Sequence, residues 1–463
     1  MVKQSMENKQ LELNGMIGLE IHTYLVTKEK LFCRCKASRE KGLKSNINIC
    51  PICTGQPGAK PMLPNETALK QAVRIGLMLG CKINNELVWK RKHYNWPDLP
   101  KGYQNTLSGA NAVPVGENGK FMGIKISSMH LEEDPASWNP ETGEVDYNRS
   151  GLPLVEIVTA PDFSTAEEVM DWLWKLVHAL SYLKAVDSNA GIKVDTNVSI
   201  PKKTERVEIK NLNSIENVGK AIEYELERQA EEGGKKKETR RWDDAKGKTI
   251  LMRSKEDAED YRFISDPDLL NIMIDKKFID ELKKSMPESP DVKLEKLIKK
   301  HKIDKKNAEV LAKNIDIVEF FEKVVEKVNP AEALHWITIE LMRFLNYNKK
   351  KLHEVKIEVE HFAELLSLVH KGKITPLKGK EILNSWHPKS YMPKADDVEK
   401  ITDAEQLEKI INGVVKKNIK AVEDYNRGEQ NAFNFLMGQV MRETQKRADY
   451  TLSRKILEKV LRK

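Results

Sequence analysis

Leu154-Val155-Glu156-Ile157-Val158-Thr159 has the branched, apolar composition of a buried β-strand, and the rest of the chain can be interpreted outward from it. Side chains alternate along a strand, so Glu156 shares a face with Leu154 and Val158. A carboxylate in such a position must be ion-paired, hydrogen-bonded or bound to a metal. An ion pair with Arg149 is the simpler explanation, and a functional site is the other.

Three further segments combine an apolar face with a face of acids, His, amides or Lys. They are Gly18–Tyr24 with Glu20 and His22, Val194–Ile200 with Asp195, Asn197 and Ser199, and Val207–Lys210 with Glu208 and Lys210. Clusters rich in oxygen ligands suit Mg²⁺ together with phosphates, and a Lys would offset phosphate charge. A solvated sheet face would look similar, but it rarely concentrates Glu, Asp and His so strongly. The pattern favours a site for a metal and a nucleotide.

Four of the five cysteines form two close pairs, Cys33-Arg34-Cys35 and Cys50-Pro51-Ile52-Cys53. In an intracellular chain, two such pairs are typical of a structural zinc site with four thiolate ligands, rather than of disulfides. Free buried thiols are the alternative. Cys81 stands apart from both pairs and is expected in the core.

Composition limits the class of protein. The chain has 463 residues, enough for about three domains. Charged residues make up 32% and mean hydropathy is −0.55. There is no apolar run near the roughly 20 residues of a membrane span and no secretion signal, so we expect a cytoplasmic protein without a membrane partner. The net charge of +8 permits a polyanionic partner without requiring one.

Familiar catalytic motifs are missing from the sequence. Gly247-Lys248-Thr249 resembles the end of a phosphate-binding loop, but Trp242 occupies the position of the required upstream glycine. The chain also lacks a Gly/Ser-rich amidase signature and a convincing Cys–His pair for hydrolysing glutamine. Any ammonia is therefore expected to come from another protein.

The sequence from Val145 to Ile157 closely resembles the signature of the B subunit of the glutamyl-tRNA(Gln)/aspartyl-tRNA(Asn) amidotransferase family. Other segments similar to that family occur in the same order over residues 16–270. They are Gly18–His22, Pro97–Gln104, His130–Asp134, Glu208–Ser214 and Met252–Glu256, and the family carries a similar cysteine knuckle. The loop 187–193 departs from the family pattern.

The resemblance implies a glutamine-hydrolysing aminoacyl-tRNA amidotransferase, a carbon–nitrogen ligase, in which this chain is the kinase and transamidase component. It implies ATP, Mg²⁺ and structural Zn²⁺ as cofactors. It also implies an amidase (glutaminase) A subunit and a small C subunit as partners in a heterotrimer, and misacylated tRNA(Gln) or tRNA(Asn) as substrate. By resemblance, the metal ligands with catalytic roles are His22, Glu133 and Glu156, and the nucleotide or second-metal contacts are Glu20, Asp195 and Lys210.

The expected fold is α+β. A mostly antiparallel, cradle-like catalytic domain (1–287) carries the zinc knuckle at 33–53, and a helical domain (288–400) and a helical tail (401–463) follow. Helices are also expected after Asn65 and after a capping box at Ser164–Glu167. The last segment, Met441–Lys463, holds eight Lys or Arg and three acids. It is either a solvated face or a tRNA-binding surface.

Two other functions remain open from the residues alone. A non-catalytic, zinc-containing tRNA-binding protein would explain the cysteines and the basic tail, but not the acidic strands. A stand-alone carboxylate–ammonia ligase of the glutamine-synthetase type would explain the acids, but not the tail.

Overall fold

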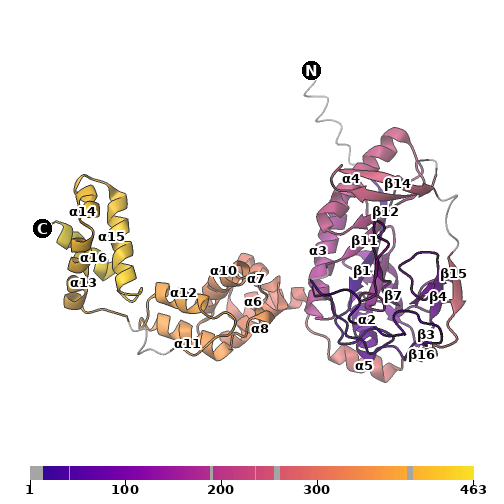
Figure 1. Cartoon of the computed structure of the whole chain (residues 1–463), viewed down its shortest axis with the longest axis horizontal. Helices are drawn as coiled ribbons and strands as arrows, with labels where there is room; N and C mark the ends of the chain where they lie inside the picture. Colours follow the sequence, from indigo (N-terminus) through magenta and orange to yellow (C-terminus); the bar gives the residue numbers. More distant parts are fainter. Residues whose placement is uncertain are drawn as a thin grey trace, which may run out of the picture. The chain divides into compact units, whose positions relative to one another are not determined.

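A twelve-stranded sheet forms the frame of the first part of the chain (Figure 1). The computed structural model describes residues 14–40, 42–187, 191–234, 236–254, 261–393 and 400–462. Contacts divide the chain into two units, Met1–Ser289 and Pro290–Lys463. The predicted further division near residue 400 adjoins residues 394–399, which lie outside the described residues, and it stays a prediction.

The strand order in the sheet is β14-β13-β12-β11-β1-β10-β7-β5-β4-β15, with β6 also paired to β7 and β2 to β6. Only the β12–β13 pair is parallel among these described strands, so the prediction of a mostly antiparallel sheet is confirmed. The strands are β1 (Met16–Tyr24), β2 (Lys82–Ile83), β4 (Lys90–His93), β5 (Tyr103–Thr106), β6 (Gly116–Phe121), β7 (Ile124–Glu133), β10 (Pro153–Thr159), β11 (Lys193–Ser199), β12 (Val207–Leu212), β13 (Glu238–Asp243), β14 (Lys248–Ser254) and β15 (Arg262–Ser265). Two small sheets pair β3 (Glu86–Leu87) with β16 (Ile272–Met273), and β8 (Ser137–Trp138) with β9 (Val145–Asp146).

Helices of the first unit begin at side chains that satisfy free backbone N–H groups. They are α2 (Glu66–Met78), α3 (Ala166–Tyr182), α4 (Ile215–Glu232) and α5 (Lys276–Lys284). Asn65 caps α2 as predicted, accepting from the N–H groups of Thr67 and Ala68. The predicted capping box at Ser164 and Glu167 is wrong by one residue. Thr165 and Glu168 form it, because Thr165 is the last residue in extended conformation.

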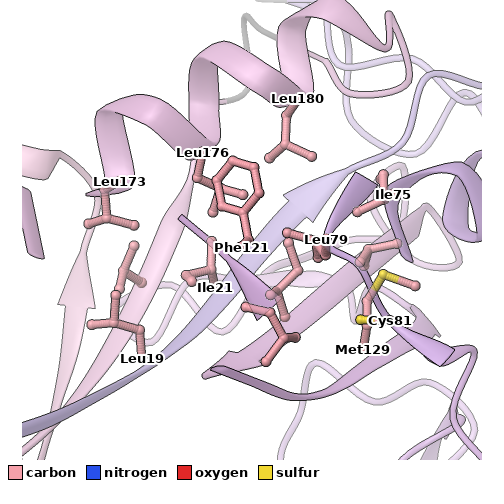
Figure 2. Packing of buried hydrophobic residues seen from close by; sticks show 14 of the residues in the cluster. Leu19, Ile21, Ile75, Leu79, Cys81, Phe121, Met129, Leu173, Leu176 and Leu180 are labelled. Carbon is pink, nitrogen blue, oxygen red and sulfur yellow. The ribbon is translucent and has the colours of Figure 1, made fainter. Parts of the chain in front are cut away.

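The core of this unit lies against one face of the sheet. Leu173, Leu176 and Leu180 of α3 point toward Leu19 and Ile21 of β1, with Phe121 between them (Figure 2). Ile75 and Leu79, from α2 and its C-terminal end, pack beside Met129 of β7. Because strand side chains alternate, burial of this face turns Glu20 and His22 to the opposite face.

The second unit is helical, as predicted. Its elements are α6 (Pro290–His301), α7 (Lys305–Ala312), α8 (Ile315–Val324), α9 (Pro330–His335), a π-helical turn (Trp336–Leu341), α10 (Met342–Tyr347), a 3-10 turn (Leu352–Glu354), α11 (Val359–His370), α12 (Pro376–Asn384), α13 (Ala404–Lys417), α14 (Ile419–Asn426), α15 (Gln430–Glu443) and α16 (Tyr450–Leu461). One apolar cluster lies between Leu297 and Trp386 and another between Leu407 and Leu461. No helix in the described ranges is long and apolar enough to cross a membrane.

Candidate active site

Polar side chains of five adjacent strands meet on the sheet face opposite the core. His22 of β1 pairs with Glu156 of β10, which in turn pairs with His130 of β7. On the other side of β1, Glu20 pairs with Asp195 of β11. Strand register therefore gathers residues that are more than 100 positions apart in the sequence.

His22, Glu132 and Glu156 form the first cluster. The His22 Nε2 atom lies 3.3 Å from Glu156 Oε2 and 3.9 Å from Glu132 Oε1. One ligand atom from each residue falls within 4.8 Å of the others. The buried atoms His22 Nδ1 and Glu132 Oε2 have no hydrogen-bond partner among the described residues. Lone pairs left in this way beside two carboxylates fit a divalent cation, so these residues could hold Mg²⁺.

The two carboxylates of this cluster differ in their proton affinity. Burial alone would raise the pKa of Glu156, but its hydrogen bond to His22 and the positive charges nearby lower that pKa to about 2. Burial raises the pKa of Glu132, and repulsion from Glu156 raises it further. Burial disfavours charge on His22, yet Glu156 and its acidic neighbours raise the His22 pKa above its ordinary value. A cation would relieve the repulsion between these acids.

Glu133, which was predicted to be a metal ligand, does not join this cluster. Its Oε1 atom accepts hydrogen bonds from Lys101 Nζ and, at 2.9 Å, from the backbone N–H of Asn105. Along β7, Glu133 alternates with Glu132 and so points to the other side of the strand. The structure brings Glu132 beside His22 and Glu156 instead, and a metal-binding role for Glu133 stays a prediction.

Glu20, Asp195 and Glu208 form the second cluster, and their ligand atoms also lie within 4.8 Å of one another. Lys210 Nζ lies 2.9 Å from Asp195 Oδ2 and 2.7 Å from Glu208 Oε1. Burial disfavours its charge, but Asp195 and Glu208 raise the Lys210 pKa above its ordinary value. The predicted contacts Glu20, Asp195 and Lys210 are thus together, with Glu208 added to them. Residues 188–190 of the divergent loop lie outside the described residues.

Basic and aromatic side chains border the acidic face. The Arg39 guanidinium lies 3.4 Å from the ring centroid of Tyr24, and the Lys92 ammonium lies 4.7 Å from that of Tyr261. The positive charge of Lys92 lowers the pKa of both Glu132 and Glu156, although other causes are larger for each acid. These cations suit an anionic ligand at the edge of the site.

Sequence reasoning missed Glu132 as a member of the first cluster, whereas it had already placed Glu208 beside Lys210 on the polar face of their strand. Alternation was the available signal for Glu132, since Met129 and Leu131 are buried in the core and residues 130 and 132 must face the other way. His130 shares that face, but its two ring nitrogens are engaged by Leu107 O at 2.9 Å and Ser128 Oγ at 2.8 Å. It is therefore a structural residue.

The four paired cysteines converge on one point. Cys53 Sγ lies 3.9 Å from Cys50 Sγ and 4.0 Å from Cys35 Sγ. A tetrahedral zinc–thiolate centre with metal–sulfur bonds of about 2.3 Å has sulfur–sulfur distances of about 3.8 Å. The backbone N–H of Cys50 donates to Cys53 Sγ at 3.2 Å, which favours a thiolate there. Cys33, Cys35, Cys50 and Cys53 could therefore hold a zinc ion, whereas Cys81 is buried elsewhere in the core.

Known proteins similar to this chain were found over both units. The family profile described as the GatB/GatE catalytic domain matches residues 15–280, and the profile described as the GatB domain matches residues 319–461. A protein of Methanocaldococcus jannaschii is 44% identical over 453 residues, covering 93% of this chain and 94% of that protein. Proteins of Methanosphaera stadtmanae and Methanopyrus kandleri are 39% and 40% identical, covering 96% of this chain and 99% and 98% of their own. All three are named as the B subunit of an aspartyl/glutamyl-tRNA(Asn/Gln) amidotransferase.

Proposed function

The chain belongs to the GatB/GatE family, and from this premise we propose that it is the B subunit of a tRNA-dependent amidotransferase. Its substrate is Glu attached to tRNA(Gln) or Asp attached to tRNA(Asn). The side-chain carboxylate is first phosphorylated by ATP and then converted to an amide by ammonia. The observation that carries this proposal is the pair of acidic clusters on one sheet face, each with buried ligand atoms that lack hydrogen-bond partners among the described residues.

The reaction needs two stages because an ionised carboxylate is a poor electrophile. In the first stage, a carboxylate oxygen of the substrate attacks the γ-phosphorus of ATP, the bond to the β-phosphate oxygen breaks, and ADP leaves. In the second stage, ammonia attacks the activated carbonyl carbon. The bond to the phosphate oxygen breaks, inorganic phosphate leaves, and the nitrogen loses a proton.

The residues of this chain bind and orient the reactants in that scheme. His22, Glu132 and Glu156 would hold Mg²⁺, and Glu20, Asp195 and Glu208 position the ammonium group of Lys210. When bound, Mg²⁺ offsets the charge of the transferring phosphoryl group and helps to align it. Lys92 on β4 and Lys210 on β12 supply further positive charge toward the phosphates of ATP. In the sheet, these two strands lie at opposite ends of the series β4-β5-β7-β10-β1-β11-β12.

Partners follow from the same proposal. Ammonia comes from glutamine hydrolysed by an amidase A subunit, and a small C subunit completes a heterotrimer. The basic segment Met441–Lys463, most of which forms α15, α16 and their connection, contacts the tRNA backbone. The cysteine centre holds zinc as a structural element of the catalytic domain.

A comparison of Glu132→Gln with Glu133→Gln tests the proposal at single-residue resolution. The complex is assayed for ADP release and amide formation with ATP, Mg²⁺, ammonium and Glu-tRNA(Gln) or Asp-tRNA(Asn). Glu132→Gln removes a ligand charge, so we expect tRNA-dependent ADP release to fall about 100-fold or more. Glu133→Gln removes only the partner of Lys101, and we expect a loss within about tenfold.

Two outcomes would contradict this scheme. A larger loss in Glu133→Gln than in Glu132→Gln would restore the ligand set implied by sequence resemblance. Wild-type complex that binds aminoacyl-tRNA without releasing ADP would instead support the alternative of a non-catalytic tRNA-binding protein.

A further inference from the structure

Lys30 is a buried cation that the reaction scheme does not use. Its side chain is 1% exposed, and its ammonium group donates a 3.0 Å hydrogen bond to the backbone carbonyl of Tyr147. Burying an ammonium group costs several kcal/mol unless negative charge compensates it. A neutral carbonyl satisfies one donor without supplying that charge. A source of negative charge must therefore lie close to Lys30.

The carbonyl that Lys30 contacts belongs to the signature loop, defined as residues 145–152, which comprises β9 and its connection to β10. This loop leads directly into the strand that carries Glu156. Its Arg149 lies 3.2 Å from the buried Asp134, which follows Glu132 and Glu133 at the end of β7. The position of the loop is therefore connected to both strands that supply the first acidic cluster.

The cysteine knuckle, residues 33–53, is joined to the signature loop by a dense set of hydrogen bonds. Asn148 Oδ1 accepts from the N–H groups of Ile47 and Asn48, each at 2.9 Å, and Asn148 Nδ2 donates to Lys44 O at 2.8 Å. Tyr147 N donates to Asn46 Oδ1 at 2.7 Å. At the metal-ligating end of the knuckle, Ser150 Oγ donates to Cys53 O at 2.7 Å. Asn148 and Ser150 are buried, so the hydrogen bonds of their side chains are at least partly shielded from water.

Gly151 of the signature loop lies beside both Lys30 and Cys53. A Cβ atom on Gly151 would lie 3.7 Å from both Cys53 Cβ and Lys30 Cδ, and the φ angle of 82° favours glycine. The backbone N–H of Leu31, the next residue after Lys30, donates to Gly151 O at 2.8 Å. The charge of Lys30 also acts on Cys53, whose pKa is lowered chiefly by its hydrogen bond with Cys33 and in smaller part by Lys30.

Two groups near Lys30 could supply its compensating charge. Four thiolates around one divalent ion leave two negative charges on the cysteine centre. Glu133 is the other source, since its Oε2 atom lies 3.9 Å from the same Cβ position on Gly151. The carboxylate of Glu133, however, already accepts hydrogen bonds through its other oxygen, Oε1, from Lys101 Nζ and the Asn105 N–H, so Lys101 compensates its charge. We therefore assign the negative charge that compensates Lys30 to the cysteine centre.

We infer that Lys30 couples the metal-loaded cysteine centre to the signature loop, because its buried ammonium group binds the Tyr147 carbonyl while its side chain and Cys53 both pack against Gly151. Loading of the centre places negative charge near the Lys30 side chain and so holds it in place, and Lys30 in turn holds the signature loop against the knuckle. Lys30 is thus a positioning residue. Its consequence for amidation rests on the proposed function, whereas the coupling itself does not.

The experiment uses the full-length chain and needs neither tRNA nor ATP. Lys30→Met keeps much of the side-chain volume and removes the charge, and Lys28→Met, at an exposed position two residues earlier, is the matched control. Zinc transfer to a chromogenic chelator measures the rate of zinc release from the cysteine centre. Hydrogen exchange of the peptide 145–152 measures the protection of the signature loop. Loss of an outer-shell partner typically weakens metal binding 10–100-fold, so we expect zinc release at least about tenfold faster in Lys30→Met. Exchange across 145–152 should accelerate while the β1 peptide, residues 16–24, stays protected.

Two further measurements decide the source of the charge and keep the test independent of variant folding. Glu133→Gln should release zinc at the wild-type rate. Chelation of zinc from the wild-type chain should reproduce the loss of protection at 145–152. Wild-type zinc release in Lys30→Met, or a signature loop that stays protected after zinc removal, would overturn the coupling. Neither result depends on ADP formation, so a failure here is distinguishable from a failure of the proposed function.

Discussion

Lys210→Met would leave the second acidic cluster without its central cation. In the wild-type chain, Lys210 Nζ contacts Asp195 and Glu208 at 2.9 Å and 2.7 Å, and the ligand atoms of these acids and Glu20 lie within 4.8 Å of one another. Burial already raises the pKa of Glu20, and repulsion from Glu156 and Glu208 raises it further. Methionine would fill a similar volume, so the change isolates the charge.

The magnitude follows from the exposure of the pair. Removing one partner of a buried ion pair typically costs about 3–5 kcal/mol. The Lys210 side chain is 31% exposed, so solvent screens part of the interaction. We therefore expect a loss of about 2 kcal/mol in the free energy of unfolding. For the unit Met1–Ser289, that corresponds to a fall in Tm of about 3 °C.

Thermal unfolding of the full-length chain in metal-free buffer measures this effect, with Lys220→Met as a control on the exposed face of α4. Mg²⁺ would replace the missing positive charge, so its addition should raise the Tm of Lys210→Met more than that of the wild type. An equal Tm for both proteins without Mg²⁺, or an equal response to Mg²⁺, would refute the argument that Lys210 neutralises this cluster.

The same variant has a defined pH dependence. Burial raises the folded-state pKa of Glu20, and without the opposing charge of Lys210 this pKa rises further above that in the unfolded chain, so the folded state binds more protons. Stability then falls as pH rises through the interval between the unfolded and folded pKa values of Glu20. The difference in Tm from the wild type should be largest near neutral pH and shrink as pH falls toward 5. A difference that grows on acidification would contradict this assignment.

Two other changes test the zinc site and the tail. Cys50→Ser should release about one zinc per chain and lower the Tm; metal analysis that finds no zinc in wild-type protein prepared without chelators would contradict it. Deletion of residues 405–463 removes the apolar cluster Leu407–Leu461 as a whole, so the rest should stay folded while tRNA affinity falls and its salt dependence flattens. Unchanged affinity with a lost maximal amidation rate would show instead that the tail organises the active site.

Local patterns predicted the elements of the fold well. Branched strands such as Leu154–Thr159 and capped helices such as the one after Asn65 carry their own signals. The order of strands in the sheet has no such signal, because β1 pairs with β10 and β11, which lie more than 100 residues away. The polar faces of these strands suggested that they share one site, and the resemblance to a known family supported placing them in one domain. The parallel pairing of β12 with β13 was not predicted from any residue.

On β7, the predicted ligand Glu133 is the sequence neighbour of Glu132, whose side chain lies in the first cluster. Residues 132 and 133 are both Glu, so composition does not distinguish them. The alternation of side chains along β7 distinguishes them once Met129 and Leu131 are known to face the core. Which face of β7 is buried, however, depends on its packing against α2 and the neighbouring strands. Glu208 was placed on the correct strand face with Lys210, yet its contact with Asp195 and Glu20 depends on the register between β11 and β12. A bulge between Val194 and Thr196 shifts that register.

The position of β1 between β10 and β11 separates the two clusters. His22 belongs to one and Glu20 to the other, and two strand residues span about 7 Å. Metal ions that act as a pair lie about 3.5–4 Å apart, so the backbone spacing favours two distinct functions over one shared two-metal centre. Both clusters have a buried ligand atom without a hydrogen-bond partner among the described residues, but the first combines two acids with a His whereas the second combines three acids with a Lys. The second already surrounds the Lys210 ammonium group. This difference favours a metal in the first cluster and, in the second, a lysine held rigidly for contact with phosphate.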